Sequence, residues 1–413
     1  MILRCPRCHQ KNRLPDDLVL NGEYLCRCGQ ILFGATATDK PLSPLPPLRP
    51  AAGPIARPAV KTAFRSAGRF NDAELRRRLR AVKPRPLVLI NAAYVLVLAA
   101  LSLSNAVGPE LWWGGSLNLY LPQWLWALPG VILLPLTFWA NRKWAVIPFL
   151  TLLWVFGPIM GFCPHWPASP DAISGGGAGG RLRVMTYNVK WGTRDSGAVV
   201  TDIRAFHPDL IQFQDSERVM DGEIGRALVG WNVRRSGQYL VASHLPLPEL
   251  ESRDISYDGS DHHCVRCLLQ VGTSQVAVYD VHLLSPRDGL VSVRHHEIGG
   301  LVGNTGNRLE EAARLGAYLQ AEPGPTIVTG DLNAPVQSLA CRRLFDAGLR
   351  DAFSEVGSGY GYSYGAFTGV QMPYVRIDHV LVSRQWQVRH CWVGNAQGSD
   401  HRPVIADLVL APS

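Results

Sequence analysis

Polar residues that can do chemistry recur at the ends of short apolar runs in the second half of this 413-residue chain. The segments that share this placement are Thr186–Asn188, Gln212–Asp215, Tyr279–His282, Gly330–Asn333, Arg376–His379 and Ser399–His401. A folded scaffold presents catalytic groups at strand ends and in loops. The pattern therefore predicts one site assembled from distant parts of the chain.

The residue types at these positions suit the hydrolysis of a phosphoester. A hard divalent cation neutralises charge on phosphoryl oxygens, and it takes carboxylate and amide oxygens as ligands. The candidates of this kind are Asn188, Asp215, Asp331, Asn333 and Asp400. A protonated imidazole can donate a hydrogen bond to the phosphoryl oxygen and a proton to the leaving alkoxide. The candidates for that task are His282 and His401.

In this order and spacing the segments resemble the endonuclease/exonuclease/phosphatase superfamily, which has the deoxyribonuclease I-like fold. The most specific part is Gly330-Asp331-Leu332-Asn333, followed about seventy residues later by Ser399-Asp400-His401. The resemblance covers roughly residues 181 to 410. It implies an α/β fold, a four-layer sandwich of two packed β-sheets flanked by helices, and cleavage of phosphoester bonds with Mg²⁺ or Mn²⁺.

The resemblance also implies a role for each catalytic candidate. Asp331 aligns or deprotonates the attacking water, and Asn333 helps to hold the phosphate. His282 and His401 occupy the two imidazole positions of the family. Asp378 matches the carboxylate that orients the second of these histidines.

On the metal side of the cleft the resemblance places Asn188, Asp215 and Asp400. This chain departs from the family at one of them, since Gln214-Asp215 stands where the family usually has Gln-Glu. The shorter side chain moves the carboxylate by about 1 Å. Glu217 can face the same side if the strand continues that far, so it is a reserve ligand.

Several further residues carry weaker signals. Arg287 is either a phosphate or headgroup contact or an ordinary surface arginine. Cys264 and Cys267 lie three apart in an expected strand, so they point to opposite faces and favour core packing over metal or redox chemistry. Cys341 and Cys391 can pair outside the cytosol, and the sequence leaves this open.

The elements that must position these residues follow from the apolar pattern. Short β-branched runs predict strands at 183–188, 210–214, 275–283, 326–329, 377–383 and 403–409. The segment 308–320 has the apolar spacing of an amphipathic helix. With about 230 residues, 181–413 can bury its own core as a mixed α/β domain.

The first half of the chain has a different composition. Residues 86–109 and 111–141 contain no Asp, Glu, Lys or Arg, and 47% of the whole chain is hydrophobic. Three apolar stretches, Pro86 to about Ser104, Leu117 to about Ala140 and Trp144 to about Cys163, are long enough to cross a bilayer as helices. We therefore expect three transmembrane helices within 86–163, with a buried helical hairpin of a soluble enzyme as the alternative.

The charges around these stretches predict their orientation. A basic cluster with Arg76, Arg77, Arg78 and Arg80 precedes the first stretch, and Arg142-Lys143 lies in the second loop. Basic loops remain on the cytoplasmic side of a membrane. We therefore expect the spans to lie in a bacterial inner membrane, with the N-terminus in the cytoplasm and the domain beyond residue 165 outside the cytoplasm.

The first 35 residues hold two cysteine pairs, Cys5 with Cys8 and Cys26 with Cys28. Their spacing predicts a small Zn²⁺ module, against the alternative of a disulfide-linked or free-thiol tail. The segment resembles short bacterial zinc ribbons, although the second pair is Cys-x-Cys rather than Cys-x-x-Cys. Such a module would face the cytosol and could recruit a partner there. Residues 36–85 form a proline-rich and then basic linker, and 164–180 form a second linker of glycine and proline.

The function predicted from these observations is a membrane-anchored, metal-dependent phosphodiesterase, nuclease or phosphatase acting outside the cytoplasm. Its substrate is a small phosphodiester, a lipid headgroup or a nucleic acid. Residues 181–413 carry 22 basic and 25 acidic side chains, with Lys190 the only lysine, which tilts the choice away from long nucleic acids. A non-catalytic binding module on the same fold is the alternative.

Overall fold

A computed structural model of the chain describes residues 2–4, 11–13, 24–25, 31–33, 84–166, 180–192, 194–257, 259–365, 372–395 and 398–411. By its internal contacts the chain divides into two compact units, Met1–Arg69 and Phe70–Ser413. In the first unit two short hairpins are described. Their strands are β1 (Ile2–Arg4) with β2 (Lys11–Arg13), and β3 (Tyr24–Leu25) with β4 (Ile31–Phe33), both antiparallel.

The cysteines predicted to bind zinc lie outside the described residues, as does nearly all of the linker predicted at 36–85. These cysteines are Cys5, Cys8, Cys26 and Cys28. The zinc module therefore stays a prediction.

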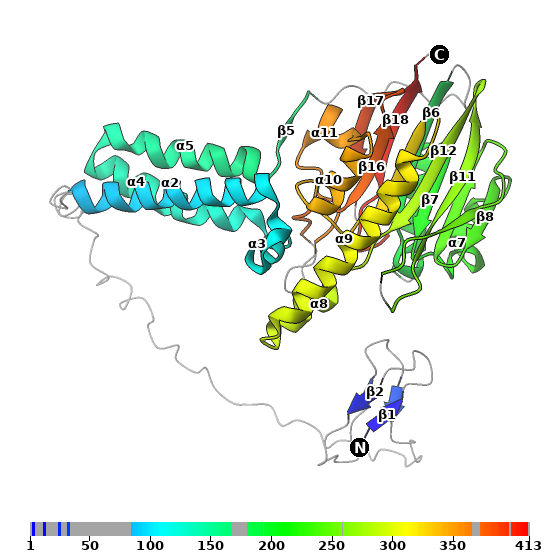
Figure 1. Cartoon of the computed structure of the whole chain (residues 1–413), viewed down its shortest axis with the longest axis horizontal. Helices are drawn as coiled ribbons and strands as arrows, with labels where there is room; N and C mark the ends of the chain where they lie inside the picture. Colours follow the sequence, from blue (N-terminus) through cyan, green and yellow to red (C-terminus); the bar gives the residue numbers. More distant parts are fainter. Residues whose placement is uncertain are drawn as a thin grey trace, which may run out of the picture. The chain divides into compact units, whose positions relative to one another are not determined.

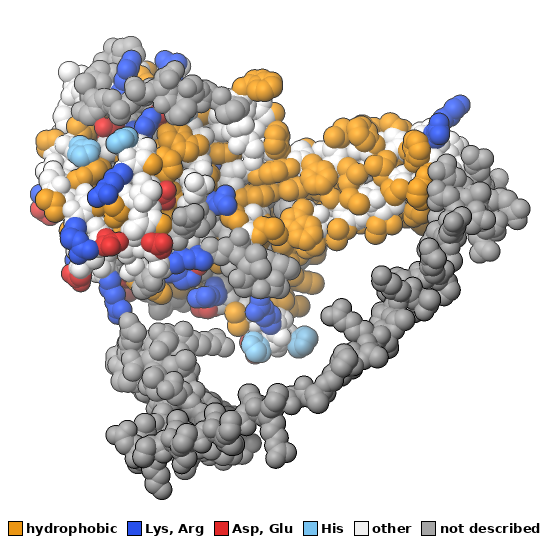
Figure 2. Space-filling model, turned by 180° about the vertical axis from the view of Figure 1, so that it is seen from behind, with side chains coloured by type: hydrophobic (Ala, Val, Ile, Leu, Met, Phe, Trp, Pro, Cys, Tyr) orange, Lys and Arg blue, Asp and Glu red, His pale blue; other side chains and the backbone are white. Residues whose placement is uncertain are grey.

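The second unit begins with helices. Three helical stretches are long and apolar enough to cross a membrane, namely Pro86–Val107, Gln123–Ala140 and Arg142–Ile159. Apolar side chains cover the surface of this bundle (Figure 2). Its elements in chain order are α2 (Pro84–Val107), η2 (Pro109–Leu111), α3 (Trp113–Asn118), η3 (Gln123–Ala127), α4 (Leu128–Ala140), η4 (Arg142–Ala145), α5 (Val146–Trp154) and the π-helix η5 (Val155–Ile159).

The second apolar stretch starts later than its composition predicted. Residues 117 and 118 end the short helix α3, and the stretch itself begins at Gln123, directly after Pro122. Proline has no backbone N–H and fits the start of a helix better than its interior. The third stretch also ends earlier than expected, at Ile159 rather than near Cys163.

The rest of this unit is built around two six-stranded mixed sheets (Figure 1). The first has the order β10-β11-β12-β13-β16-β14, and the second β17-β18-β6-β7-β9-β8. The strands of the first sheet are β10 (Glu251–Asp254), β11 (His263–Val271), β12 (Ser274–His282), β13 (Thr326–Asp331), β14 (Leu349–Asp351) and β16 (Asp378–Ser383). Those of the second are β6 (Arg181–Asn188), β7 (Leu210–Gln214), β8 (Asn232–Ser236), β9 (Tyr239–Ser243), β17 (Trp386–Val393) and β18 (Val404–Leu410).

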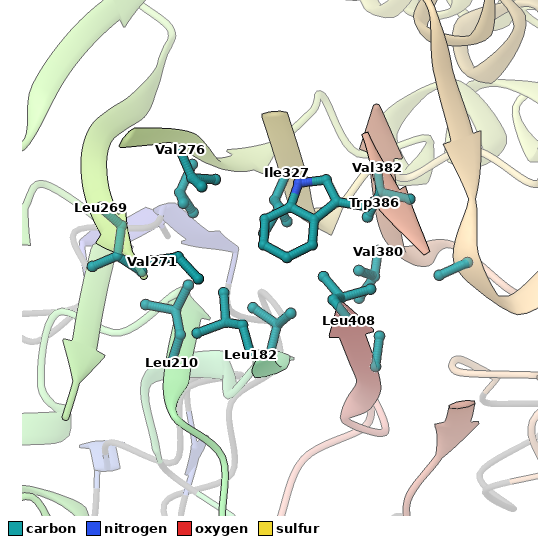
Figure 3. Close-up of a cluster of buried hydrophobic side chains, with 14 of the residues drawn as sticks. Leu182, Leu210, Leu269, Val271, Val276, Ile327, Val380, Val382, Trp386 and Leu408 are labelled. Atoms are coloured by element: carbon teal, nitrogen blue, oxygen red, sulfur yellow. The ribbon is translucent and has the colours of Figure 1, made fainter. Parts of the chain in front are cut away.

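The two sheets pack face to face over one apolar core. Figure 3 shows side chains of both sheets in this core, including Leu182, Leu210, Ile327 and Val380, around the buried ring of Trp386. Burial of each such side chain contributes about 2 kcal/mol. The shared core fixes the two sheets relative to each other, and with them the ends of their strands.

Helices cover the outer face of each sheet, which gives four layers. On the first sheet a separate core is completed by α9 (Ile298–Gln320) and α10 (Leu339–Asp346). On the second sheet the outer core is completed by α6 (Ser196–Phe206) and α7 (Glu223–Ala227). The remaining elements are η7 (Lys190–Gly192), η8 (Val219–Asp221), α8 (Arg287–Arg294), α11 (Ala352–Val356) and the strand pair β5 (Cys163–Pro164) with β15 (Ser358–Gly359).

The cysteines expected in strands and helices all pack in these cores. Cys264 lies in the core under α9 and Cys267 in the core between the sheets, so the two do point to opposite faces of β11. Cys341 and Cys391 are likewise in different cores, and both are free thiols. The pairing of Cys341 with Cys391, which the sequence left open, is therefore not formed, because a whole sheet separates the two cores.

Candidate active site

Strand pairing in the first sheet brings three predicted residues into one row. In the parallel pair β12–β13, His282 lies opposite Asp331. In the antiparallel pair β13–β16, Asp331 lies opposite Asp378. Directly opposed residues point to the same face of a sheet. The three side chains therefore share the face that carries the core between the sheets, at its edge.

The second sheet adds Asn188 from the end of β6. Its Nδ2 donates a hydrogen bond of 3.1 Å to Oδ2 of Asp331, and both residues are buried. Its Oδ1 accepts a hydrogen bond of 3.1 Å from the backbone N–H of Lys190. The contact between Asn188 and Asp331 joins residues 143 positions apart and ties the two sheets together at the site.

Asp331 is the centre of this cluster. Its Oδ2 lies 3.6 Å from Nε2 of His282 and 3.6 Å from Nε2 of His401. Burial raises the pKa of Asp331, the neighbouring His401 opposes that shift, and the charge of Asp378 adds to it. A buried carboxylate between two imidazoles can position a water molecule and accept its proton.

Asp378 contacts His401, the histidine with which the family resemblance pairs it. Nδ1 of His401 lies 2.9 Å and 3.1 Å from the two carboxylate oxygens of Asp378, which leaves Nε2 directed toward Asp331. Burial lowers the pKa of His401, but the charges of Asp378 and Asp331 outweigh it and raise that pKa to about 9. The imidazole is therefore protonated at neutral pH. The ring of Tyr364 covers it, with centroids 4.7 Å apart.

Steric crowding requires a glycine at the first position of Gly330-Asp331-Leu332-Asn333. A Cβ at Gly330 would lie 1.8 Å from the carbonyl oxygen of Val281 on the neighbouring strand, and its φ is +138°. Asn333 has a φ of +47°, which asparagine tolerates better than most residues. Its backbone N–H donates to Oδ1 of Asp331 at 2.9 Å, and its side chain donates to the carbonyl of Leu283 at 2.9 Å. The motif thus fixes the turn that holds Asp331 in place.

His282 is held by a residue that the sequence did not reveal. Its Nδ1 donates a 2.6 Å hydrogen bond to Oε1 of Gln238, a half-buried residue between β8 and β9. Nothing around Gln238 marks it in the sequence, because a glutamine beside Gly237 is ordinary in a hairpin turn. Asp215 lies 3.6 Å from the same Nδ1 and has a φ of +50°.

Asp400 forms an ion pair with Lys190. Burial alone would raise the pKa of Asp400, but the hydrogen bond from Lys190 and the charge of His401 lower it. The role of Lys190 was missed, although a lone lysine two residues after Asn188 was a usable signal.

Three residues near the motifs lie outside the cluster. The strand β7 ends at Gln214, so it does not continue to Glu217, whose side chain is exposed; the condition for its reserve role is not met. Arg287 is exposed at the first position of α8. His379 points to the other face of β16, where its Nε2 donates to the carbonyl of Ala334 at 3.0 Å.

The donor set fits a hard divalent cation. Ligand atoms of Asp331, Asp378 and His401 lie within 4.8 Å of one another, and the amide of Asn188 adjoins them. Asp378 and Nδ1 of His401 are engaged with each other, so Asn188, Asp215 and Asp400 are the residues whose oxygens would hold a cation beside Asp331. Oxygen donors of this kind suit Mg²⁺ or Mn²⁺.

A family profile described as the endonuclease/exonuclease/phosphatase family matches residues 185–401, more than half of the chain. The chain belongs to this family. Endonuclease/exonuclease/phosphatase proteins are phosphoester hydrolases and generally use a divalent metal. No curated protein matches the chain at a significant level.

Solved structures similar to this chain include an endonuclease/exonuclease/phosphatase protein, a phosphatase and a nuclease. One from Beutenbergia cavernae is 17% identical, covers 56% of this chain and 72% of its own, and has a TM-score of 0.42. A mannosyl-6-phosphatase from Bacteroides thetaiotaomicron is 16% identical, with coverage of 55% and 100% and a TM-score of 0.43. An AP endonuclease from Archaeoglobus fulgidus is 15% identical, with coverage of 55% and 98% and a TM-score of 0.44. The family assignment rests on the profile match.

Proposed function

We propose that this protein is a membrane-anchored, divalent-metal-dependent phosphoester hydrolase whose catalytic domain acts outside the cytoplasm. The observation that carries the proposal is the buried contact of Asp331 with His401, His282 and Asn188. In this arrangement Asp331 aligns the attacking water and accepts its proton. Asn333 and His282 help to hold the phosphoryl group, and His401 gives a proton to the leaving oxygen.

Asn188, Asp215 and Asp400 would hold the metal at the edge of this cluster. When bound, Mg²⁺ or Mn²⁺ supplies positive charge that stabilises the phosphoryl oxygens as the bond breaks. Asp378 keeps Nδ1 of His401 engaged, so that Nε2 is the atom that carries the mobile proton.

The test is hydrolysis of bis-p-nitrophenyl phosphate by the full chain in detergent micelles, with Mg²⁺ or Mn²⁺ and with EDTA. We expect metal-dependent release of nitrophenol, and its loss by at least about 10²-fold in the Asp331→Ala/His401→Ala variant. Asp346→Ala removes an exposed carboxylate outside the cluster and is the matched control. If the wild type and the double variant are equally inactive on a broad panel of phosphoesters, the protein is a binding module on this fold.

The membrane location has a separate test. We infer an N-terminus in the cytoplasm and a catalytic domain outside, from three spans and the basic residues before the first one and in the second loop. A reporter active only outside the cytosol, fused after Ser413, should be active. The same reporter fused after Arg142 should be silent, and the opposite result would overturn this orientation.

The N-terminal module has its own proposal. We infer that Cys5, Cys8, Cys26 and Cys28 bind Zn²⁺ and that the module recruits a cytosolic partner. Metal analysis of the full chain should give one zinc that Cys5→Ser releases, and a pull-down should lose its partner with the same variant.

A further inference from the structure

The segment between the first two candidate spans contacts the loop that follows Asp331. The hydroxyl of Tyr120 donates a 2.8 Å hydrogen bond to the carbonyl of Asn333, and Tyr120 is buried. The guanidinium of Arg308, on α9, lies 5.5 Å from the centre of the Tyr120 ring. Tyr120 is three residues before Gln123, where the second span begins. The loop after Asp331 is therefore in contact with the boundary of the membrane-spanning part.

A second contact joins the start of α10 to the end of the first span. Both carboxylate oxygens of Glu110 accept a 3.0 Å hydrogen bond from the backbone N–H of Leu339. Arg342 donates to the carbonyl of Ala106 at 2.7 Å and also to that of Asn105. Ala106 is within the first span.

A third contact links the other side of the cluster to the third span. Tyr360 and Tyr362 pack against the core of the helical bundle, and the hydroxyl of Tyr362 donates to the carbonyl of Met160 at 3.3 Å. Two residues further on, Tyr364 covers the ring of His401. Asp331 and His401 are thus each held by a segment that touches a span end. The headgroup layer is about 5 to 8 Å thick on each side of a bilayer, and these contacts bring the cluster toward the span ends that border it.

The helical hairpin of α8 and α9 extends from the sandwich next to this region. The two helices pack on each other, and α9 also contacts α3. In Figure 1 the end of the hairpin where α8 meets α9 reaches the level of α3 along the axis of the bundle. The hairpin therefore reaches the depth at which the spans end.

The hairpin carries exposed charges at its tip, at Arg294 and Glu297, whereas the first half of α9 has none. From Ile298 to Asn307, the first ten residues of α9 contain no charged side chain. Val291, Ile298 and Val302 are exposed, with Val302 at 53%. A helix facing water normally carries charged residues on its outer side, whereas apolar side chains at this depth suit the boundary between headgroups and acyl chains.

We propose that the α8–α9 hairpin lies on the bilayer surface and that the site cleaves phosphoesters of membrane lipids. This specificity depends on the proposed hydrolase function and membrane location. Arg287, exposed at the first position of α8, is the cation of this hairpin that we assign to a headgroup phosphate. In the reaction the water oxygen bonds to phosphorus and its proton passes to Asp331. The ester bond breaks, and the departing oxygen takes a proton from His401 and leaves as an alcohol.

The experiment uses the full chain reconstituted in vesicles of phosphatidylethanolamine and phosphatidylglycerol, with phosphorus NMR to follow the headgroup esters. Dibutyryl forms of the same lipids, dissolved in water, present the same ester without a bilayer. Bis-p-nitrophenyl phosphate reports the hydrolase activity itself. The test variant is Val291→Glu/Val302→Glu, and the matched control is Val229→Glu, which is 80% exposed after α7 on the other sheet.

We expect the wild type to cleave the bilayer lipids, and the double variant to lose about tenfold on them while staying within about twofold on both soluble substrates. Val229→Glu should change none of the three rates. If the double variant lost equal activity on all three substrates, or lost no activity on the vesicles, the proposed contact between the hairpin and the bilayer would be wrong. Cleavage of bis-p-nitrophenyl phosphate without cleavage of any lipid would overturn the lipid specificity and leave the hydrolase function standing, whereas inactivity on all three would refute the hydrolase function as well.

Discussion

Each side chain of the cluster around Asp331 is fixed by a second residue. His401 is held by Asp378, His282 by Gln238, and Asp331 by Asn188 and the turn to Asn333. Catalytic groups that are held in this way do not have to reorganise during the reaction. The supporting residues should therefore matter for the rate nearly as much as the groups that touch the substrate.

Asp378→Asn tests this directly. The wild-type imidazole of His401 loses its proton as the pH rises through about 9, because Asp378 and Asp331 raise its pKa against the opposing effect of burial. Without the charge of Asp378 that pKa falls, so the alkaline limb of the pH–rate profile should move to lower pH. We also expect kcat/KM to fall by about 10² to 10⁴-fold. An unchanged alkaline limb would show that His401 is not the proton donor.

Gly330→Ala tests the steric account of the motif. The added Cβ would meet the carbonyl of Val281 at 1.8 Å, so β12 and β13 must separate. We expect a loss of about 3 kcal/mol or more in the free energy of unfolding, measured by thermal denaturation. Gly324→Ala is the control, since its Cβ would lie 3.6 Å from the nearest atom, the carbonyl of Gln275. Equal stability of the two variants would contradict the steric account.

At the scale of elements, the sequence predicted the strands of the site well. Leu210–Gln214 matches β7, and the strands ending at Asn188, His282 and Ser383 have bounds within two residues of those expected. Each carries a β-branched run closed by polar residues. The sequence could also place Asp378 at the start of its strand. Parallel and antiparallel pairing then brought these ends together, as the family resemblance implied.

Other elements left weaker signals in the sequence. Helix α9 starts at Ile298, ten residues before the predicted start, because four glycines in its first half conceal the helical pattern. The contact of Gln238 with His282 depends on the pairing of β8 and β9 and has no local signature. Glu217 was considered as a reserve metal ligand on the condition that the strand continues to it. The strand ends earlier, and Asp215, just beyond its end, has a positive φ.

A buried hydrogen bond between two polar side chains connects the two sheets next to the site. Nε2 of Gln214 on β7 donates to Oδ1 of Asp280 on β12 at 2.6 Å, and burial raises the pKa of Asp280 well above its usual value. The unfolded chain therefore releases a proton that the folded chain keeps. Stability contributed by such a group is lost as the pH rises from the unfolded pKa toward the folded one.

Asp280→Asn removes this dependence without changing the shape of the side chain. The stability of the variant relative to the wild type should grow from about pH 4 upward, by at most about 1.4 kcal/mol per pH unit. Asp202→Asn is a control, since burial raises the pKa of Asp202 to about 6 and its gain should stop growing there. Thermal unfolding across the pH range measures both. If the stability of Asp280→Asn relative to the wild type also stopped growing near pH 6, Asp280 would be ionised in the folded protein above that pH.

At the scale of the whole molecule, the helices and the catalytic domain share contacts that composition could not predict. The loop between the first two candidate spans carries one acidic residue, Glu110, and this residue is half-buried against α10. Long-range contacts of this kind depend on the tertiary fold and not on local pattern. The segment expected to be a free linker also begins inside the domain, because Pro164 pairs with Ser358.

Glu110→Ala should weaken this attachment. It removes the acceptor for the N–H of Leu339, at the first position of α10, and we expect the catalytic domain to lose about 1 kcal/mol of stability. Glu110→Gln keeps an acceptor oxygen and is the matched control. Hydrogen exchange of α10 in the full chain should rise in the first variant and not in the second. Equal exchange in both variants would mean that the contact does not stabilise α10.

The pairing of β5 with β15 restricts how the catalytic domain moves. A domain joined to its anchor by one flexible tether sweeps a hemisphere and meets molecules arriving from any direction. Here the chain leaving the third span is paired into a sheet within four residues of Ile159. In the proposed membrane location the domain therefore turns together with the helices, so reactants reach the site from a limited range of directions.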